Sequence, residues 1–383
     1  MADIKHNKLI RLSKSCLSDA EKQAVMGVLD REFLGMGPDV DQFEKALSDF
    51  FGRPVICVVN GTAALHLALQ ACGIGRGDEV LLPSLTYIAS FQAISATGAS
   101  SVSCDINSET FLLDLENAKK RITQKTKAIM PVHYTGGVGD LDAVYTFAKK
   151  NGLKVIEDAA HAFGSTYKGK RVGSFGEVAC FSFDGIKNIT SGEGGCIITE
   201  DENILQKVRD ARLLGVEKDT DRRYLGERSW EFDTTAQGWR YHMSNIMAAI
   251  GLEQLKRFPY FAKKRQQLAK QYDSLFTNHP VIKSIPRDYE TVVPHIYVVR
   301  IIGMKNRRII QQELADSNIQ VGYHYQPNHW LKYFSGESPI LLPITDAIVP
   351  ELLTLPLHPD LTESDIEYVA SKLEKIVENQ DGW

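Results

Sequence analysis

The feature that most constrains the fold is a regular alternation between residues 55 and 200. Short apolar runs stand at 55–59, 80–82, 102–104, 128–132, 155–156, 178–183 and 196–199. Between the earlier runs, apolar residues recur with helical spacing at about 61–72, 87–97, 111–121 and 140–150. Strands that alternate with helices are joined by crossovers, which predicts an α/β fold with a mostly parallel sheet. The last runs have little helix between them, so we expect the sheet to be mixed there.

The segments on either side of this alternation predict further helices and a second domain. Residues 18–51 contain two helical patterns, and the first begins with a capping box, Ser18 followed three residues later by Glu21. A long helix is predicted from 244 to about 277, then short β-like runs at 292–302, a helix at 305–317, an aromatic and histidine-rich loop at 322–334 and a last helix at about 362–378. We therefore expect a large domain, 1–255, whose N-terminal segment can pack on the small domain, and a small α/β domain, 256–383.

Composition excludes several classes of protein. The 383 residues include 44 Lys and Arg against 48 Asp and Glu, a formal charge of −4, which argues against a basic nucleic-acid-binding surface. The six cysteines form no CxxC pair and have no zinc-ligand spacing with a histidine, so we expect reduced thiols and no metal site. No run approaches the roughly 18 apolar residues of a membrane span, and the first residues do not resemble a signal peptide. We expect a soluble cytoplasmic protein with neither a membrane nor a nucleic-acid partner.

Two segments carry the strongest chemical signal. In the first, the apolar run that begins at Val155 ends in Asp158 and is soon followed by His161. In the second, the run that ends at Phe183 leads into Lys187 and a glycine-rich tail. Ligands in α/β folds bind at the carboxyl ends of strands. A lysine between apolar neighbours is partly desolvated, which lowers the pKa of an amine as a Schiff-base lysine requires.

Pyridoxal phosphate fits this set of residues. It needs a lysine for its aldehyde, an acid for its ring nitrogen and donors for its phosphate. Gly61 and Thr62 turn the chain from a strand into a helix whose N-terminus can bind phosphate, and Ser182 adds a hydroxyl. Tyr87, early in the next helix, can stack on the cofactor ring.

Each of these residues, taken alone, also has an ordinary structural explanation. An aspartate at the end of a strand, like Asp158, is more often a cap or turn residue, and a lone lysine like Lys187 is usually a solvated side chain. Gly61 and Thr62 are also typical of an ordinary helix start. His161 can be a structural histidine, and Tyr87 can be a core residue. The order and context of the residues favour the cofactor site.

The chain resembles the DegT/StrS family of pyridoxal-phosphate-dependent sugar-nucleotide aminotransferases over nearly its whole length. The matching motifs are 60–65 (Asn-Gly-Thr-Ala-Ala-Leu), 83–87 (Pro-Ser-Leu-Thr-Tyr), 131–134 (Pro-Val-His-Tyr), 156–161 (Ile-Glu-Asp-Ala-Ala-His), 181–183 (Phe-Ser-Phe), 187–188 with 192–195, 243–245 with 248–252, and 355–359 (Leu-Pro-Leu-His-Pro). The resemblance implies fold type I, with a mostly parallel seven-stranded sheet between helices and a small C-terminal domain. It also implies homodimers whose two active sites are shared.

Residue roles follow from the resemblance position by position. Lys187 would bond to the cofactor aldehyde and Asp158 would pair with the ring nitrogen. His161 takes the place of a frequent glutamine beside the ring. The implied phosphate ligands are Gly61, Thr62, Ala63 and Ser182, and Tyr87 would stack on the ring.

Two stretches refine or depart from the family pattern. Where the family usually has an amide, segment 238–243 has Arg240, which can bind the partner's phosphate, reach a nucleotide diphosphate, or form an unrelated ion pair. The stretch 190–195 (Thr-Ser-Gly-Glu-Gly-Gly) resembles members that aminate C4 of a 4-keto-6-deoxy sugar nucleotide. Members that act as dehydratases replace the lysine with histidine, which Lys187 argues against.

The resulting expectation is transfer of an amino group from L-glutamate to a nucleotide-linked keto sugar, at C4 of a dTDP- or GDP-linked sugar, for glycan or O-antigen biosynthesis. The candidate substrate contacts are Met36 in the loop 33–37, Glu193, and His324 and His329 in the loop 322–334. The alternatives are amination at C3, dehydration on the same fold, and a non-catalytic regulatory protein. A dinucleotide dehydrogenase is disfavoured because no GxGxxG follows the first strand.

Overall fold

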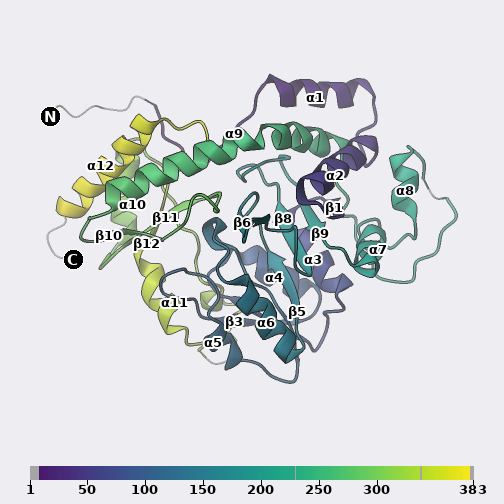
Figure 1. Cartoon of the computed structure of the whole chain (residues 1–383), viewed down its shortest axis with the longest axis horizontal. Coiled ribbons are helices and arrows are strands. Elements are labelled where there is room, and N and C mark those ends of the chain that lie inside the picture. Colours follow the sequence, from purple (N-terminus) through teal and green to yellow (C-terminus); the bar gives the residue numbers. More distant parts are fainter. Residues whose placement is uncertain (1–7, 229, 337–338, 380–383) are drawn as a thin grey trace.

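A seven-stranded sheet lies at the centre of the computed structural model, which describes residues 8–228, 230–336 and 339–379 (Figure 1). Its strand order is β1-β9-β8-β5-β4-β2-β3. The strands are β1 (Val55–Val58), β2 (Glu79–Pro83), β3 (Ser100–Cys104), β4 (Thr126–Ile129), β5 (Lys154–Asp158), β8 (Val178–Ser182) and β9 (Gly195–Ile198). Neighbours from β3 to β8 pair in parallel, whereas β9 pairs antiparallel with both β8 and β1. The sheet is therefore mostly parallel and becomes mixed at its last strand, as predicted.

Alternate residues of the strands pack on opposite faces of this sheet. Ile56 and Val58 join a cluster with α3 (Gly61–Ala71), α4 (Ile88–Ala96) and α7 (Glu202–Ala211). Val55 and Cys57 join a cluster with α2 (Pro38–Phe51) and α9 (Asn245–Phe276). On the same side as this second cluster, β2, β4 and β5 pack against α5 (Leu115–Lys119) and α6 (Leu141–Asn151). Because both faces of the sheet are buried, the strands are continuous apolar runs in the sequence.

The predicted helices are found with one correction. The capping box is present at α1 (Asp19–Asp30), where the Glu21 carboxylate accepts from the Ser18 backbone N–H at 2.7 Å. The helix predicted at 111–121 is wrong in extent, because α5 begins only at Leu115. Its late start has a local cause: the Asp114 side chain caps the helix by accepting from two backbone N–H groups, and Leu113 pairs with Ile106.

A second, three-stranded antiparallel sheet follows α9 and is built from β10 (Ile282–Ser284), β11 (Tyr297–Ile301) and β12 (Leu352–Leu355). It shares a hydrophobic cluster with α10 (Arg307–Asp316), α12 (Glu363–Asn379) and the later turns of α9. Figure 1 shows α9 running from the large sheet to this smaller one. The division at residue 255 stays a prediction, since α9 passes through it without a break.

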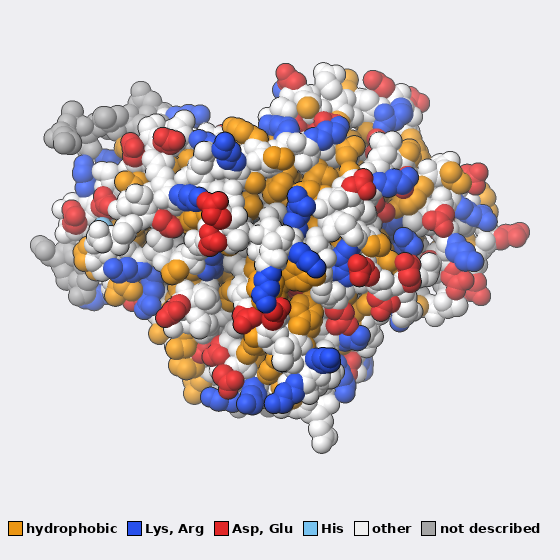
Figure 2. Space-filling view, in the orientation of Figure 1, with side chains coloured by type: hydrophobic (Ala, Val, Ile, Leu, Met, Phe, Trp, Pro, Cys, Tyr) orange, Lys and Arg blue, Asp and Glu red, His pale blue; other side chains and the backbone are white. Residues whose placement is uncertain are grey.

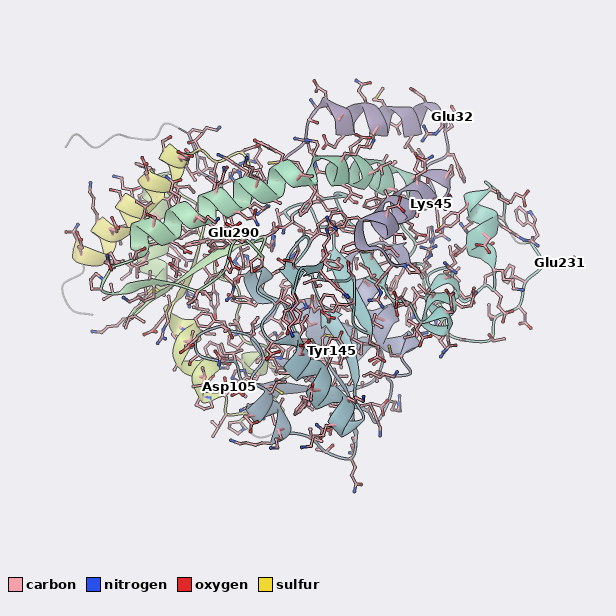
Figure 3. All side chains as sticks on the ribbon, in the orientation of Figure 1. Glu32, Lys45, Asp105, Tyr145, Glu231 and Glu290 are labelled. Atoms are coloured by element: carbon pink, nitrogen blue, oxygen red, sulfur yellow. The ribbon has the colours of Figure 1, made fainter. Side chains whose placement is uncertain are left out.

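The sequence predictions also left out several short elements. They include the strands β10 and β12, the hairpin of β6 (Thr166–Tyr167) and β7 (Lys170–Arg171), and the helices α7, α8 (Asp219–Tyr224) and α11 (Pro343–Ile348). The start of α11 is fixed by Asp105, at the end of β3 (Figure 3). Its carboxylate accepts from the backbone N–H of Ile344 at 3.0 Å and of Thr345 at 2.8 Å.

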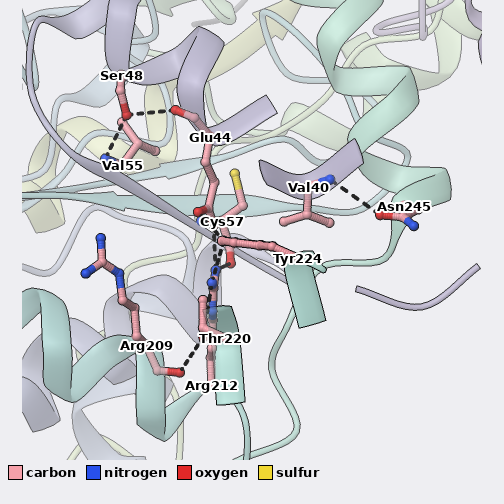
Figure 4. Close-up of polar contacts among 10 residues, drawn as sticks. All are labelled: Val40, Glu44, Ser48, Val55, Cys57, Arg209, Arg212, Thr220, Tyr224 and Asn245. Atoms are coloured by element: carbon pink, nitrogen blue, oxygen red, sulfur yellow. Dashed lines mark hydrogen bonds and ion pairs between the residues drawn. The ribbon is translucent and has the colours of Figure 1, made fainter. Parts of the chain in front are cut away.

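A buried ion pair, which we call the Glu44 clamp, joins α2, α7, α8 and β1 (Figure 4). Its members are Glu44, Arg212 and Tyr224. Arg212 is 0% exposed and donates to a Glu44 carboxylate oxygen at 2.5 Å and to the Cys57 carbonyl at 2.7 Å. Its other Nη donates to the Tyr224 hydroxyl at 2.8 Å. Burial opposes the Arg212 charge, but the Glu44 carboxylate outweighs it and raises the pKa of the guanidinium.

The surface carries acidic and basic side chains interspersed over the face drawn in Figure 2. Within the residues that the structure describes, no helix is both long and apolar enough to cross a bilayer.

Candidate active site

A cavity of about 400 Å³ lies at the carboxyl ends of β5 and β8, beside the start of α3. Volumes of this size are typical of small-ligand sites. Most of the residues predicted from the sequence line it together: Gly61, Thr62, Tyr87, Asp158, His161, Ser182, Lys187, Glu193 and His324. Two strands and one helix start thus converge, as expected at this edge of an α/β sheet.

The start of α3 is shaped to hold an anion. The Asn60 side chain caps the helix by accepting from the Ala63 N–H at 2.8 Å. The N–H groups of Gly61 and Thr62 are the first of the helix and have no acceptor within it. A Cβ at Gly61 would stand 2.8 Å from the Ser182 Cβ, so only glycine lets the helix come this close to the Ser182 hydroxyl. The dipole of α3, the free N–H groups at its start and the Ser182 hydroxyl together form a site that can bind a phosphate.

Two adjacent acids at the end of β5 point to opposite faces of the sheet. Asp158, 6% exposed, lines the cavity and accepts from the Ser90 hydroxyl at 2.6 Å and from the Ala160 N–H at 3.2 Å. Glu157 is 0% exposed and faces away, toward His133 Nε2 at 2.7 Å and the Tyr145 hydroxyl at 2.5 Å. Asp158 is therefore held in one orientation while it remains open to a ligand.

Lys187 is partly buried in the loop after β8, and its amine has an unusual environment. Burial lowers the pKa of the Lys187 amine to about 8, against the opposing effect of Asp158 and Asp184. Among the described residues, no carboxylate lies within ion-pair distance of Nζ, whose hydrogen-bond neighbour is His295 Nε2 at 3.3 Å. An amine with such a pKa is partly unprotonated at neutral pH and can act as nucleophile or base.

Aromatic rings enclose the amine. His161 Nε2 lies 3.0 Å from the Tyr325 hydroxyl, and the His161 and His295 rings are 4.6 Å apart. Burial lowers the pKa of both imidazoles well below the usual range, so both are neutral at pH 7. Tyr87, 57% exposed, packs its ring 5.4 Å from that of Tyr325.

Four residues singled out in the sequence do not line the cavity. Ala63 is buried, with its N–H donated to the Asn60 cap, and Met36 is a core residue at 1% exposure. His329 is buried between the Ser84 hydroxyl at 2.7 Å and the Asp346 carboxylate at 2.9 Å. Arg240 is exposed, in a backbone bridge to Leu213. Their predicted ligand contacts stay predictions.

Three residues of the site were missed as individual candidates. Ser90 could have been found, since it stands three positions after Tyr87 on the same helix face. Tyr325 lies in the aromatic loop whose histidines were chosen instead. His295 carries no local signal, because it is a lone histidine before an apolar strand.

The residues present fit pyridoxal phosphate. A nucleophilic amine at Lys187, an oriented carboxylate at Asp158 and a phosphate-binding helix start at α3 share one cavity. One further observation agrees: among the described residues, the buried His161 Nδ1 has no hydrogen-bond partner and is available to a ligand.

Comparison with known proteins leads to the same cofactor. The model of the DegT/DnrJ/EryC1/StrS aminotransferase family matches residues 15–374. The structure is similar to a putative sugar aminotransferase, Spr1654 from Streptococcus pneumoniae, in its PMP form, with 32% identity, a TM-score of 0.90, and coverage of 97% of this chain and 98% of that one. The PLP form of Spr1654 matches with 31% identity, a TM-score of 0.90, and coverage of 97% and 99%.

A more distant similarity is to Helicobacter pylori PseC, an aminotransferase involved in the biosynthesis of pseudoaminic acid. It has 26% identity and a TM-score of 0.89, with coverage of 97% of this chain and 100% of that one. The cavity and these similarities agree on one conclusion: the chain belongs to the DegT/DnrJ/EryC1/StrS aminotransferase family and is a pyridoxal-phosphate-dependent sugar aminotransferase.

Proposed function

We propose that the enzyme moves an amino group from L-glutamate to C4 of a nucleotide-linked 4-keto-6-deoxy sugar. The observation that carries this proposal is the convergence of Lys187, Asp158 and the start of α3 on one cavity. The stretch 190–195, which resembles that of C4-aminating members, supports the position of amination. The proposal covers dTDP-linked and GDP-linked sugars.

The residue roles follow from the contacts. When bound, pyridoxal phosphate withdraws electrons from the amino donor and makes its Cα–H acidic. Asp158, oriented by Ser90, accepts a hydrogen bond from the protonated ring nitrogen and so keeps the proton there. The N–H groups of Gly61 and Thr62 and the Ser182 hydroxyl bind the phosphate, with Ala63 buried behind them. Tyr87 and His161, which line the cavity, would contact the ring, Tyr87 by stacking and His161 beside the 3-hydroxyl.

Lys187 carries the proton that transamination requires. With a pKa lowered to about 8, its amine can take the proton from Cα and return it at the cofactor's C4′ carbon. The keto sugar is then aminated by the same steps in reverse, with Lys187 again as acid and base. Because both substrates use one cavity in turn, we expect ping-pong kinetics.

The substrate contacts and assembly are also part of the proposal. Glu193 and His324 line the cavity and would contact the sugar. The exposed Arg240 would act at the nucleotide or at the partner's phosphate, in a homodimer that shares both sites. Met36 and His329 are buried, so the sugar contacts predicted for them would require these side chains to move. We place the reaction in the cytoplasm, in the synthesis of amino sugars for glycans such as O-antigen.

Product analysis tests this function. The purified enzyme is incubated with L-glutamate and dTDP-, GDP- or UDP-linked 4-keto-6-deoxy sugars, and the products are identified by mass spectrometry and NMR. A 4-amino sugar formed from one of them, together with 2-oxoglutarate, supports the proposal. Amination of a 3-keto isomer alone, or a dehydrated sugar, would overturn it. Lys187→Ala provides the inactive control.

A further inference from the structure

Lys187 has a neighbour that the family motifs do not explain. His295, 3% exposed, stands just before β11 and brings Nε2 to 3.3 Å from the Lys187 Nζ, across 108 residues of sequence. It does not line the cavity, so it lies behind the amine rather than in the path of a substrate.

The surroundings of the imidazole decide which of its nitrogens carries the proton. Nδ1 is buried and has no hydrogen-bond partner among the residues that the structure describes. A buried N–H without an acceptor is rarer and costlier than a buried lone pair without a donor. The single proton of the neutral ring therefore belongs on Nε2, and this N–H can donate to the amine only when Nζ offers a lone pair.

The ring is held in place from two sides. The His295 carbonyl accepts from Arg265 Nη1 at 2.9 Å, and the same atom of Arg265 donates to the Leu357 carbonyl at 3.2 Å. Arg265 lies on α9 and is 2% exposed. On its other side, the imidazole packs against His161, with ring centroids 4.6 Å apart. The position of Nε2 is thus set by α9 and by the loop after β5.

We propose that His295 is a positioning residue for Lys187: its Nε2–H donates to the lone pair of Nζ and keeps the free amine unprotonated and correctly oriented. This inference rests on the proposed role of Lys187 as the proton carrier. In each half of that reaction the lysine would act as a free amine that takes up and returns a proton. A hydrogen-bond donor behind the amine keeps its lone pair oriented for this proton transfer.

The charged and titratable groups that face Lys187 come from several elements. They are Asp158 on β5, His161 after β5, Asp184 in the loop after β8, Arg265 on α9, His295 before β11, and His324 in the loop 322–334. Asp158 and Asp184 raise the pKa of Lys187 and Arg265 lowers it. The three histidines are neutral, since burial lowers the pKa of each. His295 therefore acts through its hydrogen bond and not through a charge.

The test compares variants that keep or lose a donor at the Nε2 position. His295→Gln reaches that position with an N–H, whereas His295→Asn reaches only the Nδ1 position. His295→Phe keeps an aromatic ring at this position and removes both nitrogens. Each full-length protein is loaded with pyridoxamine phosphate, which leaves the lysine free. The rate of acetylation of Lys187 by acetic anhydride is then followed against pH by peptide mass spectrometry, with thermal unfolding as a check on the fold.

In the wild type we expect an apparent pKa of Lys187 near 8. In His295→Phe and His295→Asn it should rise by about 0.5 to 1 unit, while His295→Gln stays close to the wild type. An unchanged pKa in folded Asn and Phe variants, or an equal rise in all three, would overturn the proposal. If the Phe variant fails to fold, the Gln and Asn pair decides the question. The labelling needs no sugar substrate, so failure of the proposed sugar specificity would leave this result readable.

Discussion

Arg212 and Lys187 are both cations withdrawn from water, but their surroundings differ. Arg212 is 0% exposed and bonds directly to the Glu44 carboxylate, to a carbonyl and to a tyrosine hydroxyl. Lys187 has a neutral imidazole as its neighbour, and the part of the chain described here puts no acid within ion-pair distance. As a result the pKa of Arg212 is raised and that of Lys187 is lowered to about 8.

The difference shows how the same protein holds one charge fixed and leaves another free to change. Desolvation opposes both charges, but an acid in direct contact outweighs it at the Glu44 clamp. Near Lys187, Asp158 and Asp184 act only at a distance, and desolvation prevails. The Glu44 clamp joins four elements and stabilises the fold, whereas Lys187 takes part in the proposed reaction. Four experiments test this comparison.

The largest effect is expected for Lys187→Met, which removes the amine and nearly preserves its volume. Turnover should fall by at least about 10³-fold, because no other group moves the proton, and the absorbance of lysine-bound cofactor should disappear. The cofactor-free variant should unfold within about 1 kcal/mol of the wild type, since no ion pair is broken. Lys154→Met, at a surface lysine 49% exposed and paired with Glu177, is the control and should keep its activity. Turnover above a hundredth of wild type would contradict the role of Lys187.

Glu44→Gln should act in the opposite way. It leaves the Arg212 charge buried without its acid, which costs about 3 kcal/mol of unfolding free energy, or roughly 150-fold in the unfolding equilibrium. Urea titration measures the loss. Combining Glu44→Met with Arg212→Met should recover part of the stability because no buried charge remains. A single variant within 0.5 kcal/mol of wild type would show that the clamp is not structural.

The two acids of β5 extend the comparison. Asp158→Asn should lower kcat/KM by about 100-fold, since a charged hydrogen bond to the ring nitrogen is lost, with little change in stability. Glu157→Gln should do the reverse and cost about 1–3 kcal/mol, because the partners of this buried carboxylate among the described residues are His133 and Tyr145. Steady-state kinetics and urea unfolding on both variants separate the two roles. Equal losses of activity would break the distinction.

The smallest of the four effects is expected when a carboxylate is placed beside Lys187, as Glu44 lies beside Arg212. His295→Glu puts a carboxylate beside Nζ, which favours the ammonium form and should raise the pKa of Lys187 by at least about one unit. At pH 8 the unprotonated fraction, and with it the rate of acetylation, should drop by at least about fivefold. An unchanged pH dependence would show that the identity of this neighbour is immaterial.

Local sequence was enough to predict most of the fold and the centre of the site. The apolar runs, the helical spacing and the capping box at Ser18 depend on residues a few positions apart, and the structure contains them. Asp158 and Lys187 could be selected because each follows an apolar run directly, and Gly61 because it stands between a strand and a helix. Even α5 failed only in length, where the cap at Asp114 shortened it.

Only the tertiary structure decided the contacts across long stretches of sequence. Arg212 meets Glu44 over 168 residues, and Lys187 meets His295 over 108. In the same way, Met36 was predicted to contact substrate and lies in the core, while Ser90 and Tyr325 were passed over and stand at the site. The physical reason is that the helix or strand in which a residue lies depends largely on its neighbours along the chain. The groups that desolvate it, pair with it or take its proton are set by how distant elements pack.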